Sequence, residues 1–81
     1  MKTLILYGTS GCHLCDEASH LLAYMLDESQ YHIETIDISV SDELLERYGV
    51  KIPVLQRIDS HAELHWPFDE SAVEVFLLNT P

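Results

Sequence analysis

The first half of this 81-residue chain has a pattern that few folds can accommodate: a strand-like run, an amphipathic helix and a second strand-like run. Residues 2–7 are almost continuously apolar, which is typical of a central strand buried on both faces of a sheet. From Leu14 onward apolar residues recur at helical spacing, which predicts a helix ending near Asp27 or Glu28. Residues 31–38 are rich in β-branched side chains and predict a second strand, parallel to the first with a right-handed crossover.

The second half of the chain predicts a short helix, two strands and a closing helix. Ser41 is a suitable N-cap for the short helix, and Gly49 is well placed at its C′ position. Residues 54–58 and 61–66 predict two further strands joined by a turn. Asp69 is expected to cap the last helix.

The resulting order, β-α-β-α-β-β-α, is that of the minimal thioredoxin fold, an α/β architecture. It predicts a four-stranded mixed sheet with helices on both faces. Because no linker, repeat or low-complexity segment interrupts the order, residues 1–81 are expected to form a single domain.

The chain is strongly acidic, with four basic and fourteen acidic residues and a formal charge of −10. A field of that sign repels nucleic acid and anionic membranes, so neither is an expected partner. Two interpretations of the charge remain open: it keeps a small protein soluble, or it selects cationic or neutral partners. No apolar run approaches the roughly 20 residues of a membrane span, and the N-terminus does not resemble a signal peptide. We therefore expect a cytoplasmic monomer.

The chain contains two cysteines, Cys12 and Cys15, in the sequence Cys-His-Leu-Cys. A bridge between them closes a very small loop, so a stabilising role is a poor explanation for the pair. They follow the first predicted strand and open the first predicted helix, where unpaired N–H groups and the helix dipole favour a thiolate. This placement predicts thiol–disulfide exchange, with Cys12 attacking a disulfide and Cys15 resolving the mixed disulfide.

Charged neighbours are expected to modify this reactivity. Asp16 and Glu17 oppose a nearby thiolate, whereas a protonated His13 supports it. Two other interpretations of the cysteines remain open. One is a zinc site completed by His20, which has three ligands where a structural site needs four. The other is a pair of idle cysteines on a binding scaffold.

The segment Gly8–Ala18 resembles the active-site segment of glutaredoxin-like proteins, most closely a bacterial branch of them. Residues 36–38 and 43–55 are similar to the same branch, so the resemblance covers nearly the whole chain. It implies a thiol–disulfide oxidoreductase that reduces small-molecule or protein disulfides. Two alternatives are a non-enzymatic binding module with this fold and a metal or iron–sulfur carrier that uses Cys12 with an external thiol.

The resemblance also implies a role for Pro53. The matching proline of thioredoxin-fold proteins is cis and packs beside the cysteine pair, and the residue before it, here Ile52, offers its backbone to an extended substrate. From the residues alone, an ordinary trans proline that starts a strand is the alternative. We expect His13, Leu14, Ile52 and Pro53 to contact the substrate.

The chain departs from typical glutathione-using glutaredoxins at two places. Thr9, Ser10 and Gly11 stand where those proteins usually carry a basic residue, and residues 66–70 lack the usual Gly-Gly turn. Asp69 could anchor an amine or simply cap its helix. Glutathione and thioredoxin reductase are therefore both candidate reductants, and no permanently bound cofactor is expected.

Overall fold

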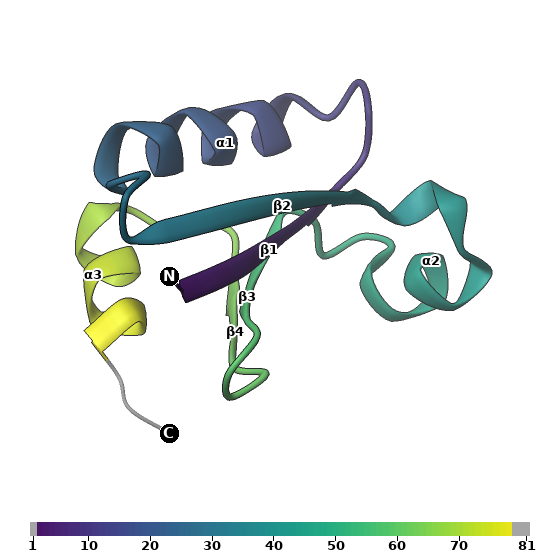
Figure 1. Ribbon diagram of the computed structural model, residues 1–81. Helices are drawn as coiled ribbons and strands as arrows, with labels where there is room; N and C mark the ends of the chain where they lie inside the picture. Colours follow the sequence, from purple (N-terminus) through teal and green to yellow (C-terminus); the bar gives the residue numbers. More distant parts are fainter. Residues whose placement is uncertain (1, 79–81) are drawn as a thin grey trace.

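The computed structural model describes residues 2–78 and has the predicted order of elements, with one additional 3₁₀ turn (Figure 1). The elements are β1 (Lys2–Gly8), α1 (His13–Met25), β2 (Tyr31–Asp37), η1 (Ile38–Val40), α2 (Asp42–Tyr48), β3 (Val54–Arg57), β4 (Glu63–His65) and α3 (Glu70–Leu78).

The four strands form one mixed sheet in the order β2-β1-β3-β4. β1 is parallel to β2 and antiparallel to β3, and β3 is antiparallel to β4. Gly8 at the end of β1 lies opposite Asp37 at the end of β2, and Tyr7 lies opposite Val54 at the start of β3. This end of the sheet therefore gathers the residues that lead into the cysteine motif and those that follow Pro53.

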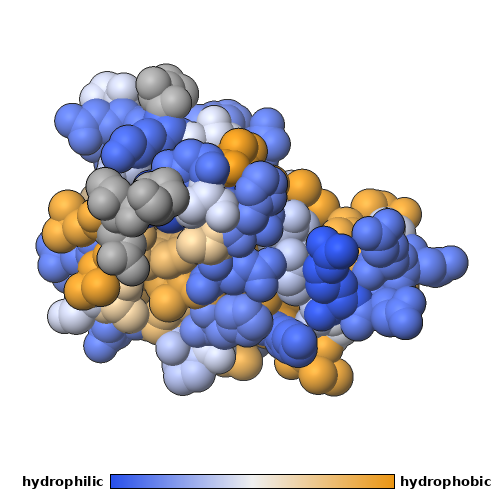
Figure 2. Space-filling view, turned by 90° about the horizontal axis from the view of Figure 1, so that it is seen from below, coloured by the Kyte–Doolittle hydropathy of each residue, from blue (hydrophilic) through white to orange (hydrophobic). Residues whose placement is uncertain are grey.

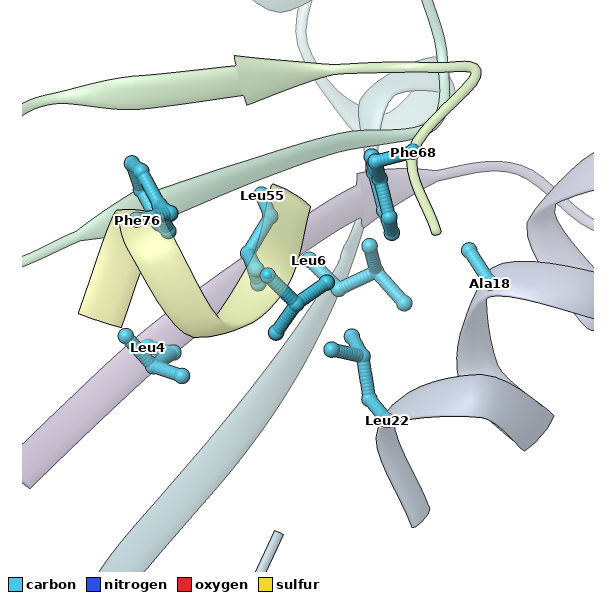
Figure 3. Packing of buried hydrophobic residues seen from close by; sticks show 8 residues of the cluster. Leu4, Leu6, Ala18, Leu22, Leu55, Phe68 and Phe76 are labelled. Atoms are coloured by element: carbon cyan, nitrogen blue, oxygen red, sulfur yellow. The ribbon is translucent and has the colours of Figure 1, made fainter. Parts of the chain in front are cut away.

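Two apolar clusters cover opposite faces of the sheet, and alternate residues of β1 contribute to each. Leu4 and Leu6 belong to the larger cluster, which α1 and α3 cover (Figure 3). Ile5 and Tyr7 belong to the smaller cluster beneath η1 and α2. The predicted burial of this strand on both faces is confirmed, as are helices on both faces of the sheet.

Two predicted elements have a boundary that is wrong by more than one residue, each for a local reason. α1 ends at Met25, short of residue 27, because the Asp27 carboxylate accepts hydrogen bonds from the backbone N–H and the hydroxyl of Ser29 and forms a turn there. The last strand covers Glu63–His65 and not 61–66, because His61 has a φ of 62° and belongs to the hairpin turn.

Gly49 ends α2, but at the C-cap position and with a φ of −10°, outside the left-handed region expected of a C′ glycine. A glycine is needed there for a different reason. A Cβ atom at this position would lie 2.7 Å from the carbonyl oxygen of Leu45, so the lack of a side chain permits a close approach.

Tyr48 attaches α2 to the sheet. It is 2% exposed, its ring stacks on that of Tyr7 with centroids 4.3 Å apart, and its hydroxyl donates to the carboxylate of Glu63 at 2.5 Å. Burial and this hydrogen bond raise the pKa of Tyr48 above its ordinary value. The Tyr7 hydroxyl donates to Gln56 Oε1 at 3.0 Å. These contacts join three strands to the helix that immediately precedes residues 49–53.

Within residues 2–78, no helix is long and apolar enough to cross a membrane. Seen from below, the surface is hydrophilic over much of its area, with apolar side chains gathered in patches between (Figure 2).

Candidate active site

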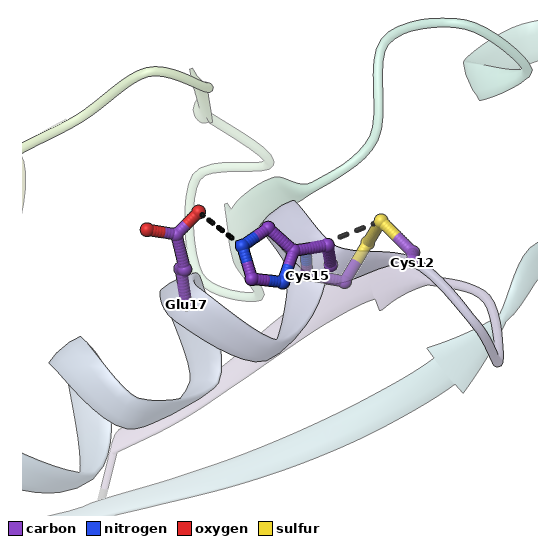
Figure 4. The surroundings of a disulfide bond; sticks show 4 residues. Cys12, Cys15 and Glu17 are labelled. Carbon is purple, nitrogen blue, oxygen red and sulfur yellow. Dashed lines mark hydrogen bonds and ion pairs between the residues drawn. A yellow bond between two sulfur atoms is a disulfide. The ribbon is translucent and has the colours of Figure 1, made fainter.

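The two cysteines lie at the start of α1 and form a disulfide (Figure 4). Cys12 is the N-cap residue, with an extended backbone conformation, and its Cα atom lies 5.2 Å from that of Cys15. The backbone N–H of Cys15 donates to Cys12 Sγ at 3.1 Å. The sulfur atom of Cys12 thus occupies the position of an N-cap acceptor, where a negative charge is stabilised.

The two sulfur-bearing residues differ in exposure. Cys15 is 7% exposed and lies in the first turn of α1, whereas Cys12 is only half-buried. Cys12 keeps part of its surface accessible although its sulfur atom caps the helix. Of the two, Cys12 is the sulfur that a partner reaches more easily.

Gly8 packs directly against the buried cysteine. A Cβ atom on Gly8 would lie 3.0 Å from Cys15 Sγ and 3.2 Å from Cys15 Cβ. The strand predicted over residues 2–7 did not reveal this contact. A glycine at the last position of a buried strand, just before the cysteine motif, was the signal available.

The charged groups of the first turns of α1 lie in solvent. His13 Nε2 is 3.7 Å from Glu17 Oε2, and the two side chains are 87% and 51% exposed. The dashed line from Glu17 in Figure 4 marks this pair. A pair this exposed contributes little free energy even when His13 is protonated. Leu14 is 43% exposed and Asp16 is exposed.

The peptide bond between Ile52 and Pro53 is cis, as predicted from the resemblance. Pro53 is fully buried, Ile52 is half-buried, and the Pro53 carbonyl oxygen accepts from the Trp66 N–H at 3.3 Å. The register of β1 with β3 brings this bond to the end of the sheet where Gly8 leads into the motif.

A second cis bond, between Trp66 and Pro67, was not predicted. The Trp66 and Phe68 rings pack edge to face with centroids 4.9 Å apart, and Phe68 is buried in the larger cluster. Asp69 Oδ1 accepts from the Ala72 N–H at 2.9 Å, so Asp69 caps α3 as predicted.

The zinc alternative required Cys12, Cys15 and His20 to converge. Among the described residues there is no group of three or more His, Cys, Asp or Glu side chains placed to hold a metal ion.

A mixed sheet of this order, a Cys-x-x-Cys pair at the start of the first helix and a cis proline before β3 together define a thioredoxin-fold protein with a redox-type cysteine pair. The family comparison is more specific. Residues 3–78 match the family described as "Glutaredoxin-like domain (DUF836)", and the chain belongs to this family.

Solved structures agree with this assignment. The chain is similar to the crystal structure of XcR50 from X. campestris, with 32% identity, a TM-score of 0.82, and coverage of 96% of this chain and 99% of that one. It is similar to the solution structure of Ne2328 from Nitrosomonas europaea, with 30% identity, a TM-score of 0.78, and coverage of 93% and 89%. A search of curated proteins found no match.

Proposed function

We propose that the protein is a thiol–disulfide oxidoreductase that uses Cys12 and Cys15 to reduce small-molecule or protein disulfides. The observation that carries this proposal is the hydrogen bond from the Cys15 N–H to Cys12 Sγ at the start of α1. In the reduced protein the same N–H group favours the thiolate form of Cys12, and the thiolate is the reactive form. The family and the unequal exposure of the two cysteines support the proposal.

The proposed reaction has two exchange steps. The Cys12 thiolate attacks one sulfur of a disulfide R–S–S–R, forms a mixed disulfide with that half, and expels the other half as a thiolate that takes up a proton. The Cys15 thiolate then attacks Cys12 Sγ, forms the internal disulfide and releases the second thiol. Two electrons pass from the cysteine pair to the substrate, and the two cysteine protons end on the two product thiols.

The proposed docking edge is formed by Ile52 and Pro53, at the end of the sheet where the cysteine motif begins. In this proposal the Ile52 backbone pairs with an extended substrate, while the exposed His13 and Leu14 contact it from the helix. The Tyr48 contacts hold the segment that carries Ile52 in place.

The reductant that restores the dithiol is part of the proposal. The two cysteines supply both electrons, so the reaction needs no bound cofactor. Glutathione and thioredoxin reductase are the two candidates, and the missing basic residue before Cys12 favours the reductase. We further propose that the protein acts as a monomer in the cytoplasm, where thiols are kept reduced.

A matched pair of variants tests the exchange steps. The reduced wild type, Cys12→Ser and Cys15→Ser are each mixed with bis(2-hydroxyethyl) disulfide and followed by mass spectrometry. We expect the wild type to form its internal disulfide, Cys15→Ser to retain a mixed disulfide on Cys12, and Cys12→Ser to react far more slowly because Cys15 is buried. Equal reactivity of the two variants, or no oxidation of the wild type, contradicts the proposal.

Turnover driven by thioredoxin reductase, run beside turnover driven by glutathione, identifies the donor. If neither donor supports turnover, and if partner binding survives Cys12→Ser, the results would instead favour a binding module.

A further inference from the structure

A groove opens beside Cys15 on the side of α1 that faces β2. It has a volume of about 310 Å³ and lies between the first turns of α1 and the ends of β1 and β2. Its lining includes Gly8, Thr9, Cys15, Asp16, Thr35 and Asp37. A ligand in this groove therefore lies next to Cys15, the buried cysteine of the redox pair, with two acidic and several hydroxyl-bearing residues in the wall of the groove.

Asp37 is held in place in this groove. It lies opposite Gly8 in the register of β1 with β2, and its Oδ1 atom accepts from the Ser39 N–H at 2.9 Å and from the Ser39 hydroxyl at 2.7 Å. These two hydrogen bonds, with a smaller contribution from the Thr9 hydroxyl, lower the pKa of Asp37. The carboxylate is therefore oriented and negatively charged.

The basic residues of the chain lie elsewhere. All four are among the described residues, and none lines the groove. Arg47 pairs with Glu43 on α2, and Arg57 pairs with Asp59 after β3. Lys2 lies at the opposite end of β1 from Gly8, and Lys51 precedes Ile52. Asp16 and Asp37 thus act on the groove without a lysine or arginine in its wall to compensate them.

We propose that this groove makes the redox site selective for disulfides that carry positive charge close to the sulfur atoms. The inference rests on the proposed exchange reaction and names the substrate class of that same site. A cationic group in the groove lies near Asp16 and Asp37 while the attached disulfide approaches the cysteine pair. A carboxylate in the same position is repelled, so the rate of attack by Cys12 depends on the charge of the substrate.

Three disulfides of nearly equal size test the selectivity: cystamine, bis(2-hydroxyethyl) disulfide and 3,3′-dithiodipropionate. Oxidation of the reduced protein is timed for each disulfide, and each rate is divided by the rate at which dithiothreitol, an uncharged dithiol, reduces the same disulfide. This ratio removes differences in leaving group between the three disulfides. We expect cystamine to be favoured over dithiodipropionate by about tenfold at low salt. The preference should fall to less than about threefold when salt is raised to about 0.5 M.

A matched pair of variants locates the effect. Asp37→Asn removes one of the two negative charges of the groove, and we expect the preference for cystamine over dithiodipropionate to fall about twofold to threefold. Asp27→Asn is its control: Asp27 accepts the same two hydrogen bonds from Ser29, at 2.9 and 2.8 Å, but lies beyond the other end of α1. The control changes the net charge equally and should keep the wild-type preference.

The outcomes separate the two proposals. Equal normalised rates for the three disulfides, or an equal effect of Asp27→Asn and Asp37→Asn, would refute the proposed charge selectivity of the groove. Neither result would contradict the exchange reaction. No oxidation by any of them refutes the exchange reaction and the selectivity together.

Discussion

Replacing Gly8 with alanine would place a methyl group 3.0 Å from Cys15 Sγ and 3.2 Å from Cys15 Cβ. Carbon atoms in contact are normally about 3.5–4.0 Å apart, so the cysteine side chain must move by a few tenths of an ångström. Such overpacking costs about 1–3 kcal/mol. Alanine also restricts the unfolded chain, which offsets about 0.4–1 kcal/mol of that cost. We expect the oxidised protein to lose about 1–2 kcal/mol of its free energy of unfolding.

The two redox forms should differ in this loss. In the oxidised protein Cys15 Sγ is held by its bond to Cys12, whereas in the reduced protein the side chain can rotate away from the new methyl group. The variant therefore destabilises the oxidised form more, which raises the reduction potential of the pair. A difference of about 1.4 kcal/mol corresponds to about 30 mV for this two-electron couple.

Urea unfolding of both forms and a redox titration against dithiothreitol measure the two effects. Gly11→Ala is the control, because a Cβ at Gly11 meets nothing within 4 Å and its φ of +78° costs the same in both forms. Two results would refute the reasoning: unchanged stability of oxidised Gly8→Ala, or a shift in potential no larger than that of Gly11→Ala.

Three further predictions concern stability. Tyr48→Phe removes the hydrogen bond to Glu63 and should lower the free energy of unfolding by about 1 kcal/mol in urea titrations, whereas an unchanged midpoint would mean that the bond contributes nothing. The hydrogen bond from Arg57 lowers the pKa of Asp59, so the stability it provides is present above the unfolded-state pKa of about 3.9 and lost as pH falls through the lower folded-state value. Asp59→Asn should therefore flatten the rise in stability between about pH 2 and pH 5, and a curve parallel to wild type would contradict this. Asp69→Ala removes the N-cap of α3 and should cost about 1 kcal/mol by thermal unfolding, with Asp69→Asn retaining most of the stability.

The amino-acid sequence by itself determined the order of the elements and the position of the cysteine pair. Apolar periodicity identified α1, and a continuous apolar run identified the burial of β1 on both faces. Side chains such as Ser41 and Asp69 marked helix starts. These features depend on residues a few positions apart, so they can be read along the chain. The cis bond at Pro53 was predicted only through the family resemblance, since the residues alone favoured a trans proline.

Only the tertiary structure decided which residues surround the cysteine pair. Gly8 contacts Cys15 because α1 folds back over the end of β1. Asp37 lines the groove beside Cys15 because β1 and β2 pair in parallel. The Tyr48 hydroxyl donates a hydrogen bond to Glu63, which lies 15 residues further along the chain. Each contact depends on strand register and on the packing of layers, which bring together residues that have no local relation in the sequence.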